Sequence, residues 1–172
     1  MNGRRLILMV LLIAAAILPA AGPAAAQATR AEFTATETWV EDISLGKEWY
    51  SGPNDKIYNE REGRSRYDVV ATDPRVSGVE IITVNLDMKL VDDPDVYFAG
   101  TMHGTFHIEN DGGTWEGLWT GVRDERGFSY IEYVGSGGGG YAGLQMRVHN
   151  QRLTPDWTVP HIWTGYILDP GQ

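Results

Sequence analysis

The carboxylate best placed for chemistry is Glu116, which lies between Trp115 and Trp119 in a segment of strand-like alternation. A carboxyl group enclosed by apolar rings would have a raised pKa and could act as a general acid or base. Alternation, however, puts the two tryptophans and Gly117 on one face of the strand and Glu116 on the other. Because bulky residues alternating with glycine suit the tapering interior of a barrel, we expect the Glu116 side chain to point outside. Glu116 is therefore only a weak catalytic candidate.

The histidines do not predict a metal site. His103 and His107 have the spacing of a helical metal-binding pair. On a strand, however, four residues span roughly 13 Å, so the two side chains cannot bind one ion. His149 and His161 are isolated in the sequence. A site assembled across strands would not be visible at this level.

Other motif matches favour no cofactor. The spacing of Gly135, Gly137 and Gly140 matches the dinucleotide fingerprint, but strand patterns lie on both sides and the pyrophosphate site needs a helix. Asp92, Asp93 and Asp95 lack the glycine and glutamate of a calcium loop. The sequence contains no G-x-S-x-G nucleophile elbow, no phosphate-binding Walker loop and no H-E-x-x-H. We expect neither a cofactor nor a metal, and a binding role is favoured over catalysis.

The N-terminus predicts export. Arg4 and Arg5 precede an apolar run from Leu6 to Leu18, and small residues end in three alanines before Gln27. This is the pattern of a secretory signal peptide, residues 1–26, cleaved after Ala26. A membrane anchor needs about 20 apolar residues, and Pro19 interrupts the run. We therefore expect a secreted or periplasmic protein with no membrane anchor after cleavage.

Composition narrows the class of protein further. Without the two signal arginines, 12 basic residues face 23 acidic ones, a net charge of −11, which disfavours binding to nucleic acid. The chain has no cysteine, so disulfides, a thiol nucleophile and a lipoprotein anchor are excluded. Residues 27–172 have the length of a single domain.

Alternation of period two predicts an all-β domain. Ile82, Val84, Leu86 and Met88 share one face of a strand, while polar residues take the other. Turn signals separate such runs, among them Asn110-Asp111-Gly112-Gly113. The predicted strands are 32–40, 65–72, 78–90, 96–109, 113–123, 127–135, 141–150 and 160–168, and residues 41–64 are predicted as a long loop. Eight antiparallel strands suggest an eight-stranded β-barrel, which has no exposed edge; a β-sandwich is the alternative.

Two segments carry a family resemblance. Thr114-Trp115-Glu116-Gly117-Leu118-Trp119-Thr120-Gly121 is followed by the glycine-rich stretch 134–144, and Asp73-Pro74 opens a further segment of this type. Over residues 70–168 the chain resembles the allene oxide cyclase and dirigent barrel superfamily, in particular its small secreted bacterial members. The resemblance implies an eight-stranded barrel with a central, mostly apolar pocket. Cyclases of that family confine an unstable fatty-acid epoxide with the help of an acidic residue and ordered water, and no residue here aligns with that carboxylate.

Apolar and aromatic side chains are the candidate ligand-binding residues. They are Met102, Phe106, Trp115, Trp119, Tyr133, Met146 and Tyr166. Such residues either fill a small barrel completely or line a cavity within it. Three functions therefore stay open: binding of a small apolar or amphipathic ligand, a cyclase or isomerase acting by confinement, and a structural protein that forms a homo-oligomer.

Overall fold

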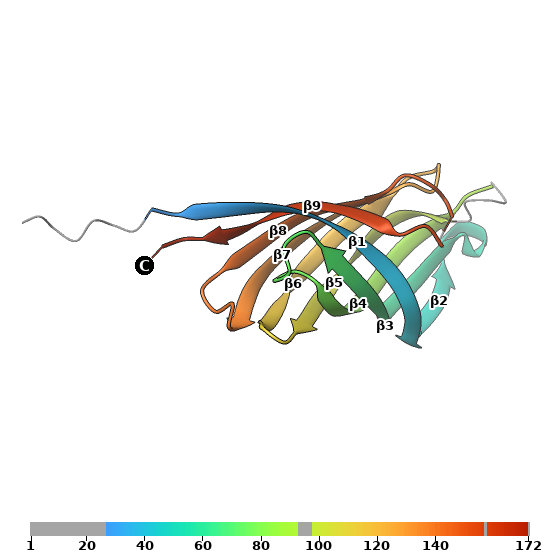
Figure 1. Ribbon diagram of the computed structural model, residues 1–172. Helices are drawn as coiled ribbons and strands as arrows, with labels where there is room; N and C mark the ends of the chain where they lie inside the picture. Colours follow the sequence, from blue (N-terminus) through green and yellow to red (C-terminus); the bar gives the residue numbers. More distant parts are fainter. Residues whose placement is uncertain (1–26, 93–97, 157, 172) are drawn as a thin grey trace, which may run out of the picture.

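The computed structural model describes residues 27–92, 98–156 and 158–171, and the predicted signal peptide together with Asp93 and Asp95 lies outside them. The described residues form one sheet of nine antiparallel strands (Figure 1), which confirms the all-β prediction. The strands are β1 (Thr29–Ser44), β2 (Lys47–Ser51), β3 (Ile57–Ala71), β4 (Gly78–Leu90), β5 (Phe98–Asn110), β6 (Gly113–Arg123), β7 (Ser129–Gly139), β8 (Gln145–Arg152) and β9 (His161–Asp169). Within the described residues the helical structure is a single 3₁₀ turn, η1 (Pro53–Asp55), and none of it is long and apolar enough to cross a membrane.

The long strand β1 closes the sheet into a ring. Its residues 29–37 pair with β9, and its residues 35–44 pair with β3. Strands β3 to β9 pair in sequence order, so eight strands surround a common interior and β2 lies outside the ring, paired with β3 alone. In Figure 1 the blue β1 runs along the red β9 and then crosses to β3. The closed, barrel-like arrangement leaves β2 paired on one side only, with β3.

The prediction of a long loop over residues 41–64 is wrong. β1 runs on to Ser44, β2 follows, and β3 begins at Ile57. The segment is polar because β2 lies outside the ring and most of its side chains are exposed. Its turn at Gly46 has a positive φ of 65°, and a Cβ there would collide with the backbone of Arg61 and Gly63.

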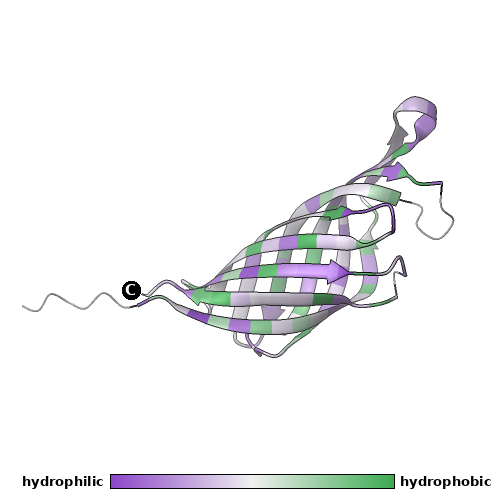
Figure 2. Cartoon of the chain, turned by 90° about the horizontal axis from the view of Figure 1, so that it is seen from above, coloured by the Kyte–Doolittle hydropathy of each residue, from purple (hydrophilic) through white to green (hydrophobic). Residues whose placement is uncertain are grey.

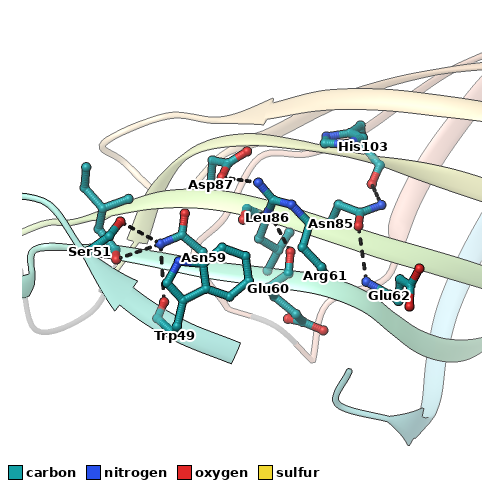
Figure 3. Close-up of polar contacts among 11 residues, drawn as sticks. Trp49, Ser51, Asn59, Glu60, Arg61, Glu62, Asn85, Leu86, Asp87 and His103 are labelled. Carbon is teal, nitrogen blue, oxygen red and sulfur yellow. Dashed lines mark hydrogen bonds and ion pairs between the residues drawn. The ribbon is translucent and has the colours of Figure 1, made fainter. Parts of the chain in front are cut away.

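Polar contacts fix this hairpin to the neighbouring strands (Figure 3). The Arg61 guanidinium donates to the Leu86 carbonyl at 2.7 Å and pairs with Asp87 at 2.6 Å. Asn59 donates its amide to the Ser51 hydroxyl at 2.9 Å and to the Trp49 carbonyl at 3.3 Å. These contacts span β2, β3 and β4, so the hairpin is held as a continuation of the ring.

The glycine-rich corner lies slightly later in the chain than predicted. β7 continues to Gly139 and β8 starts at Gln145, so Tyr141 belongs to the turn and not to the predicted strand 141–150. Gly139 and Gly143 have φ values of 60° and 90°, which favour glycine. The turn places the aromatic side chain of Tyr141 over this end of the closed sheet.

Alternation places the expected residues inside. Trp115 and Trp119 are buried, as are Ile82 and Met88 on β4, and hydropathy alternates along the strands in Figure 2. Glycines make room for the largest rings: a Cβ on Gly117 or Gly135 would lie 2.8 or 2.6 Å from the ring of Phe106. The predicted pairing of bulky residues with glycine is thus the packing that fills the narrow part of the interior.

Candidate binding cavity

One end of the ring contains a cavity of about 600 Å³. We call this the open end; it is formed by the C-terminal part of β1, the 124–128 turn and residues 158–160. Strands β4 to β7 supply a mainly apolar wall, and across the interior β1, β8 and β9 supply Glu37, Arg152 and His161. The apolar residues of the wall from β4 to β7 are Ile82, Val84, Leu86, Met88, Met102, Trp119 and Ile131. The cavity therefore has one apolar side and one polar side.

The opposite end, the closed end, is filled by side chains. It is formed by the turns 72–77, 111–112 and 140–144. The Trp115 ring stacks on Tyr141 with centroids 5.4 Å apart and donates its Nε1–H to the Arg75 carbonyl at 2.8 Å. The Tyr141 hydroxyl donates to Asn110 Oδ1 at 2.7 Å, and Val76 is fully buried beside them. Trp115, Tyr141 and Val76 are buried and packed against one another.

The predicted ligand-binding residues divide between three places. Met102, Trp119 and Tyr133 line the cavity. Phe106, Trp115 and Met146 are buried in the core and do not line it. Tyr166 lies on the outer face of β9, where the Arg30 guanidinium covers its ring at 3.7 Å. A single ligand therefore cannot touch both Trp115 and Trp119, because the strand carries one ring into the packed end and the other to the cavity.

The predicted outward orientation of Glu116 agrees with the structure. Its side chain is 70 % exposed and lies 3.0 Å from Nδ1 of His107. His149 forms a similar outer-face pair with Glu132 at 2.6 Å, and His103 is exposed. Glu116 lies on the outer face, away from the cavity, and is therefore not placed to act on a ligand there. The three histidines do not line the cavity either.

The sequence analysis missed a cluster of buried polar groups around Glu37. Its carboxylate accepts hydrogen bonds from Asn150 Nδ2 at 2.7 Å, the Tyr133 hydroxyl at 3.2 Å and Trp163 Nε1 at 3.3 Å. His161 Nδ1 lies 3.1 Å from the same carboxylate. We call these residues, with Glu80, the Glu37 cluster. Glu37, Tyr133 and His161 also line the cavity, so the cluster forms part of its wall.

Glu37 and Glu80 share one proton. Burial alone would raise the pKa of Glu37, but the hydrogen bond and charge interaction with His161 and the bonds from Glu80 and Asn150 lower it to about 2. Burial first, and then the Glu37 charge, raise the pKa of Glu80 well above its usual range. Glu80 is therefore the protonated member of the pair, beside the charged Glu37 carboxylate. Such a carboxyl–carboxylate pair is how two buried acids can lie together.

A tyrosine completes the polar side. Tyr67 on β3 lines the cavity, and burial together with the charges of Glu37 and Glu80 raises its pKa. Its hydroxyl is therefore neutral and available as a hydrogen-bond donor at ordinary pH. Within the described residues, no cluster of three or more histidine, aspartate and glutamate side chains is arranged to hold a metal ion.

Alternation contains the signal for the missed residues. Glu37 follows Phe33 and Ala35 at every second position, and Asn150 follows Met146 and Val148. A polar residue in an inward-facing series is a buried polar group that needs a partner. What the sequence cannot supply is the register, which sets Glu37 of β1 directly opposite His161 of β9.

Comparison of the chain with protein-family models, with curated proteins and with solved structures gave no match. The candidate function therefore rests on the cavity and on the residues around it.

Proposed function

We propose that this is an exported protein that binds a small, mainly apolar molecule with one polar group in the cavity at its open end. The observation that carries the proposal is the contrast inside one ring of strands: packed rings fill the closed end, whereas about 600 Å³ is left empty at the other. A volume of this size is typical of small-molecule sites, which are mostly apolar with a few placed polar groups. The absence of a catalytic sequence motif also supports binding.

The arrangement of the lining favours one ligand orientation. An apolar body would pack against Val84, Met102 and Trp119, where methionine adapts to differently shaped ligands. A carbonyl or hydroxyl group would then point to His161 and Tyr67 on the other side. Affinity in the micromolar range, about −8 kcal/mol, is expected for such a contact.

We also propose that the chain is a member of the allene oxide cyclase and dirigent-like barrels. The closed ring of eight antiparallel strands and the glycine-rich turn before β8 support this relationship. Whether it extends to cyclase activity by confinement stays a prediction. The structural alternative, a homo-oligomer, has its own support in Leu118 and Val134, which face each other across β6 and β7 and are both exposed.

Titration with a fluorescent apolar probe, N-phenyl-1-naphthylamine, tests the binding function. We expect probe emission to rise and tryptophan emission to be quenched, because Trp119 lies in the wall. Val84→Trp should fill the cavity and weaken binding at least about tenfold, or ~1.4 kcal/mol. Leu118→Trp adds the same ring on the exposed outer face and should leave binding unchanged. Equal affinities for the two variants would place the probe elsewhere and refute the cavity as the site.

A further inference from the structure

Beyond binding, we propose that His161, positioned by Glu37, is a general acid–base that transfers a proton on a carbonyl compound held in the cavity. The inference rests on the proposed binding function, because the substrate must first occupy the cavity. His161 is then the catalytic residue, and Glu37 is a positioning residue that acts through the imidazole. The substrate class is an apolar ketone with an acidic C–H group beside its carbonyl.

The imidazole is held by one ring nitrogen and presents the other. Nδ1 is buried and lies 3.1 Å from Glu37 Oε2, at ion-pair distance but without the angles of a hydrogen bond. His161 lines the cavity, and for Nε2 no hydrogen bond is found within the part of the chain that the structure describes. This is the arrangement of an imidazole base that a carboxylate orients from behind.

The Glu37 carboxylate is held by more hydrogen bonds than a simple ion pair with His161 would need. Three donors from β7, β8 and β9 hold its oxygens: Tyr133, Asn150 and Trp163. Glu80 on β4 lies beside this carboxylate as its protonated neighbour. A permanently charged carboxylate in this position orients the Nδ1–H tautomer and stabilises the imidazolium that forms when Nε2 takes up a proton.

The outer face provides two comparisons. His107 with Glu116 and His149 with Glu132 form pairs at 3.0 and 2.6 Å, close to the distance in the cavity. Both glutamates are largely exposed, so water competes for each charge. The pair in the cavity differs in two ways: Glu37 is buried, and the cavity lies beside the imidazole.

The proposed reaction needs no co-reactant. Nε2 of neutral His161 takes the proton from the carbon beside the carbonyl; the C–H electron pair forms the enolate C=C bond, and the carbonyl π pair moves to oxygen. The imidazolium then returns a proton, either the one it took or one exchanged with solvent water at Nε2, to that carbon or, in a β,γ-unsaturated ketone, to the γ carbon with a shift of the double bond. The neutral hydroxyl of Tyr67 in the cavity wall is the donor suited to the enolate oxygen.

Hydrogen–deuterium exchange of 2-tetralone, followed by proton NMR in deuterated buffer, tests the proposal, with binding measured in parallel by tryptophan fluorescence. The protein should speed exchange at saturating 2-tetralone, and His161→Gln should lower that rate by about 100-fold, within the range of general acid–base catalysis, whereas affinity for 2-tetralone should fall far less because the apolar wall is unchanged. His149→Gln, the matched outer-face change, should have no effect. Exchange no faster than in buffer, or full exchange in His161→Gln, would overturn the proposal.

Two further variants separate chemistry from folding. Glu37→Gln should lower the exchange rate without weakening binding, whereas Glu80→Gln keeps a donor toward Glu37 and should preserve the rate. Val84→Trp leaves the Glu37 cluster intact and should abolish exchange by filling the cavity, so the test survives even if His161→Gln does not fold. If N-phenyl-1-naphthylamine binds but 2-tetralone does not, the acid–base proposal fails and the binding function stands. If neither binds, both fail.

Discussion

The two ends of the ring are built from the same strands but have opposite interiors. β6 carries Trp115 into the closed end, where it stacks on Tyr141, and carries Trp119 to the cavity wall four residues later. At the closed end a glycine-rich turn brings a ring inward, whereas the turns at the open end leave space between the walls. Alternation along the strands determines which side chains point inward. The turns determine whether that end of the interior is filled by side chains or left open.

The Glu37 cluster lies where these two regions meet. Burying two carboxyl groups opposes folding, and an interior packed like the closed end would have no need of them. Hydrogen bonds from Asn150, Tyr133 and Trp163 to the Glu37 carboxylate offset part of this cost. A polar group of this kind beside an empty volume is the pattern expected of a site rather than of a core. The comparison therefore predicts different consequences of substitution at the two ends.

The largest effect on stability is expected at the closed end. Trp115→Ala removes a fully buried ring and its hydrogen bond to Arg75, and it should lower the free energy of unfolding by about 3–5 kcal/mol. Urea denaturation followed by circular dichroism measures the loss. Trp39→Ala, at a side chain that is 51 % exposed at the open end, is the control. Equal losses in the two variants would remove the distinction between the ends.

A smaller loss is expected when the turn that closes this end is strained. Gly143 has a φ of 90°, so Gly143→Val should cost about 1–3 kcal/mol. The appropriate control is Glu125→Val at an exposed position of the 124–128 turn. Ser51, which the sequence places in a loop, is unsuitable because it lies in β2 and accepts a hydrogen bond from Asn59. Thermal melting of both variants gives the measurement. A control that melts as early as Gly143→Val would show that the turn conformation is not what closes the end.

The Glu37 cluster predicts a pH dependence with opposite signs for its two acids. The pKa of Glu37 is lowered from 4.5 to about 2, so its contribution to stability is present above pH 4.5 and is lost as the pH falls toward 2. The pKa of Glu80 is raised, so its contribution is present below pH 4.5 and is lost as the pH rises.

Glu80→Gln should therefore flatten the fall in unfolding free energy on the alkaline side of pH 4.5 and leave the acid side unchanged. Urea denaturation at a series of pH values follows both limbs. An unchanged alkaline limb in Glu80→Gln would contradict the shared proton.

The parts of this molecule that sequence predicts are those governed by local pattern. Alternation places Ile82, Trp115 and Trp119 inside and Glu116 outside, because the side-chain period of a strand is fixed. It fails for residues 41–64, because β2 lies outside the ring with mostly exposed side chains, and the sequence there resembles a loop. It also misses the meeting of Glu37 with His161, which depends on the pairing of the first strand with the last.

The smallest effect on stability is expected at the rim of the open end. Leu45 lies in the cavity wall near the end of β1 yet is 59 % exposed, so Leu45→Ser removes little buried surface and should change the free energy of unfolding by under about 0.5 kcal/mol. If the open end admits a ligand, the same change should weaken N-phenyl-1-naphthylamine binding about two- to threefold, because part of the ligand loses an apolar contact at the entrance. Val70→Ser, at a similarly exposed apolar side chain of β3 that does not line the cavity, should alter neither quantity.

Urea denaturation and probe titration on the same preparations separate the two effects. If Leu45→Ser lowers stability without lowering affinity, Leu45 supports the fold and does not contact the ligand. The ligand-binding part of the interior would then start further from the rim, near Trp119.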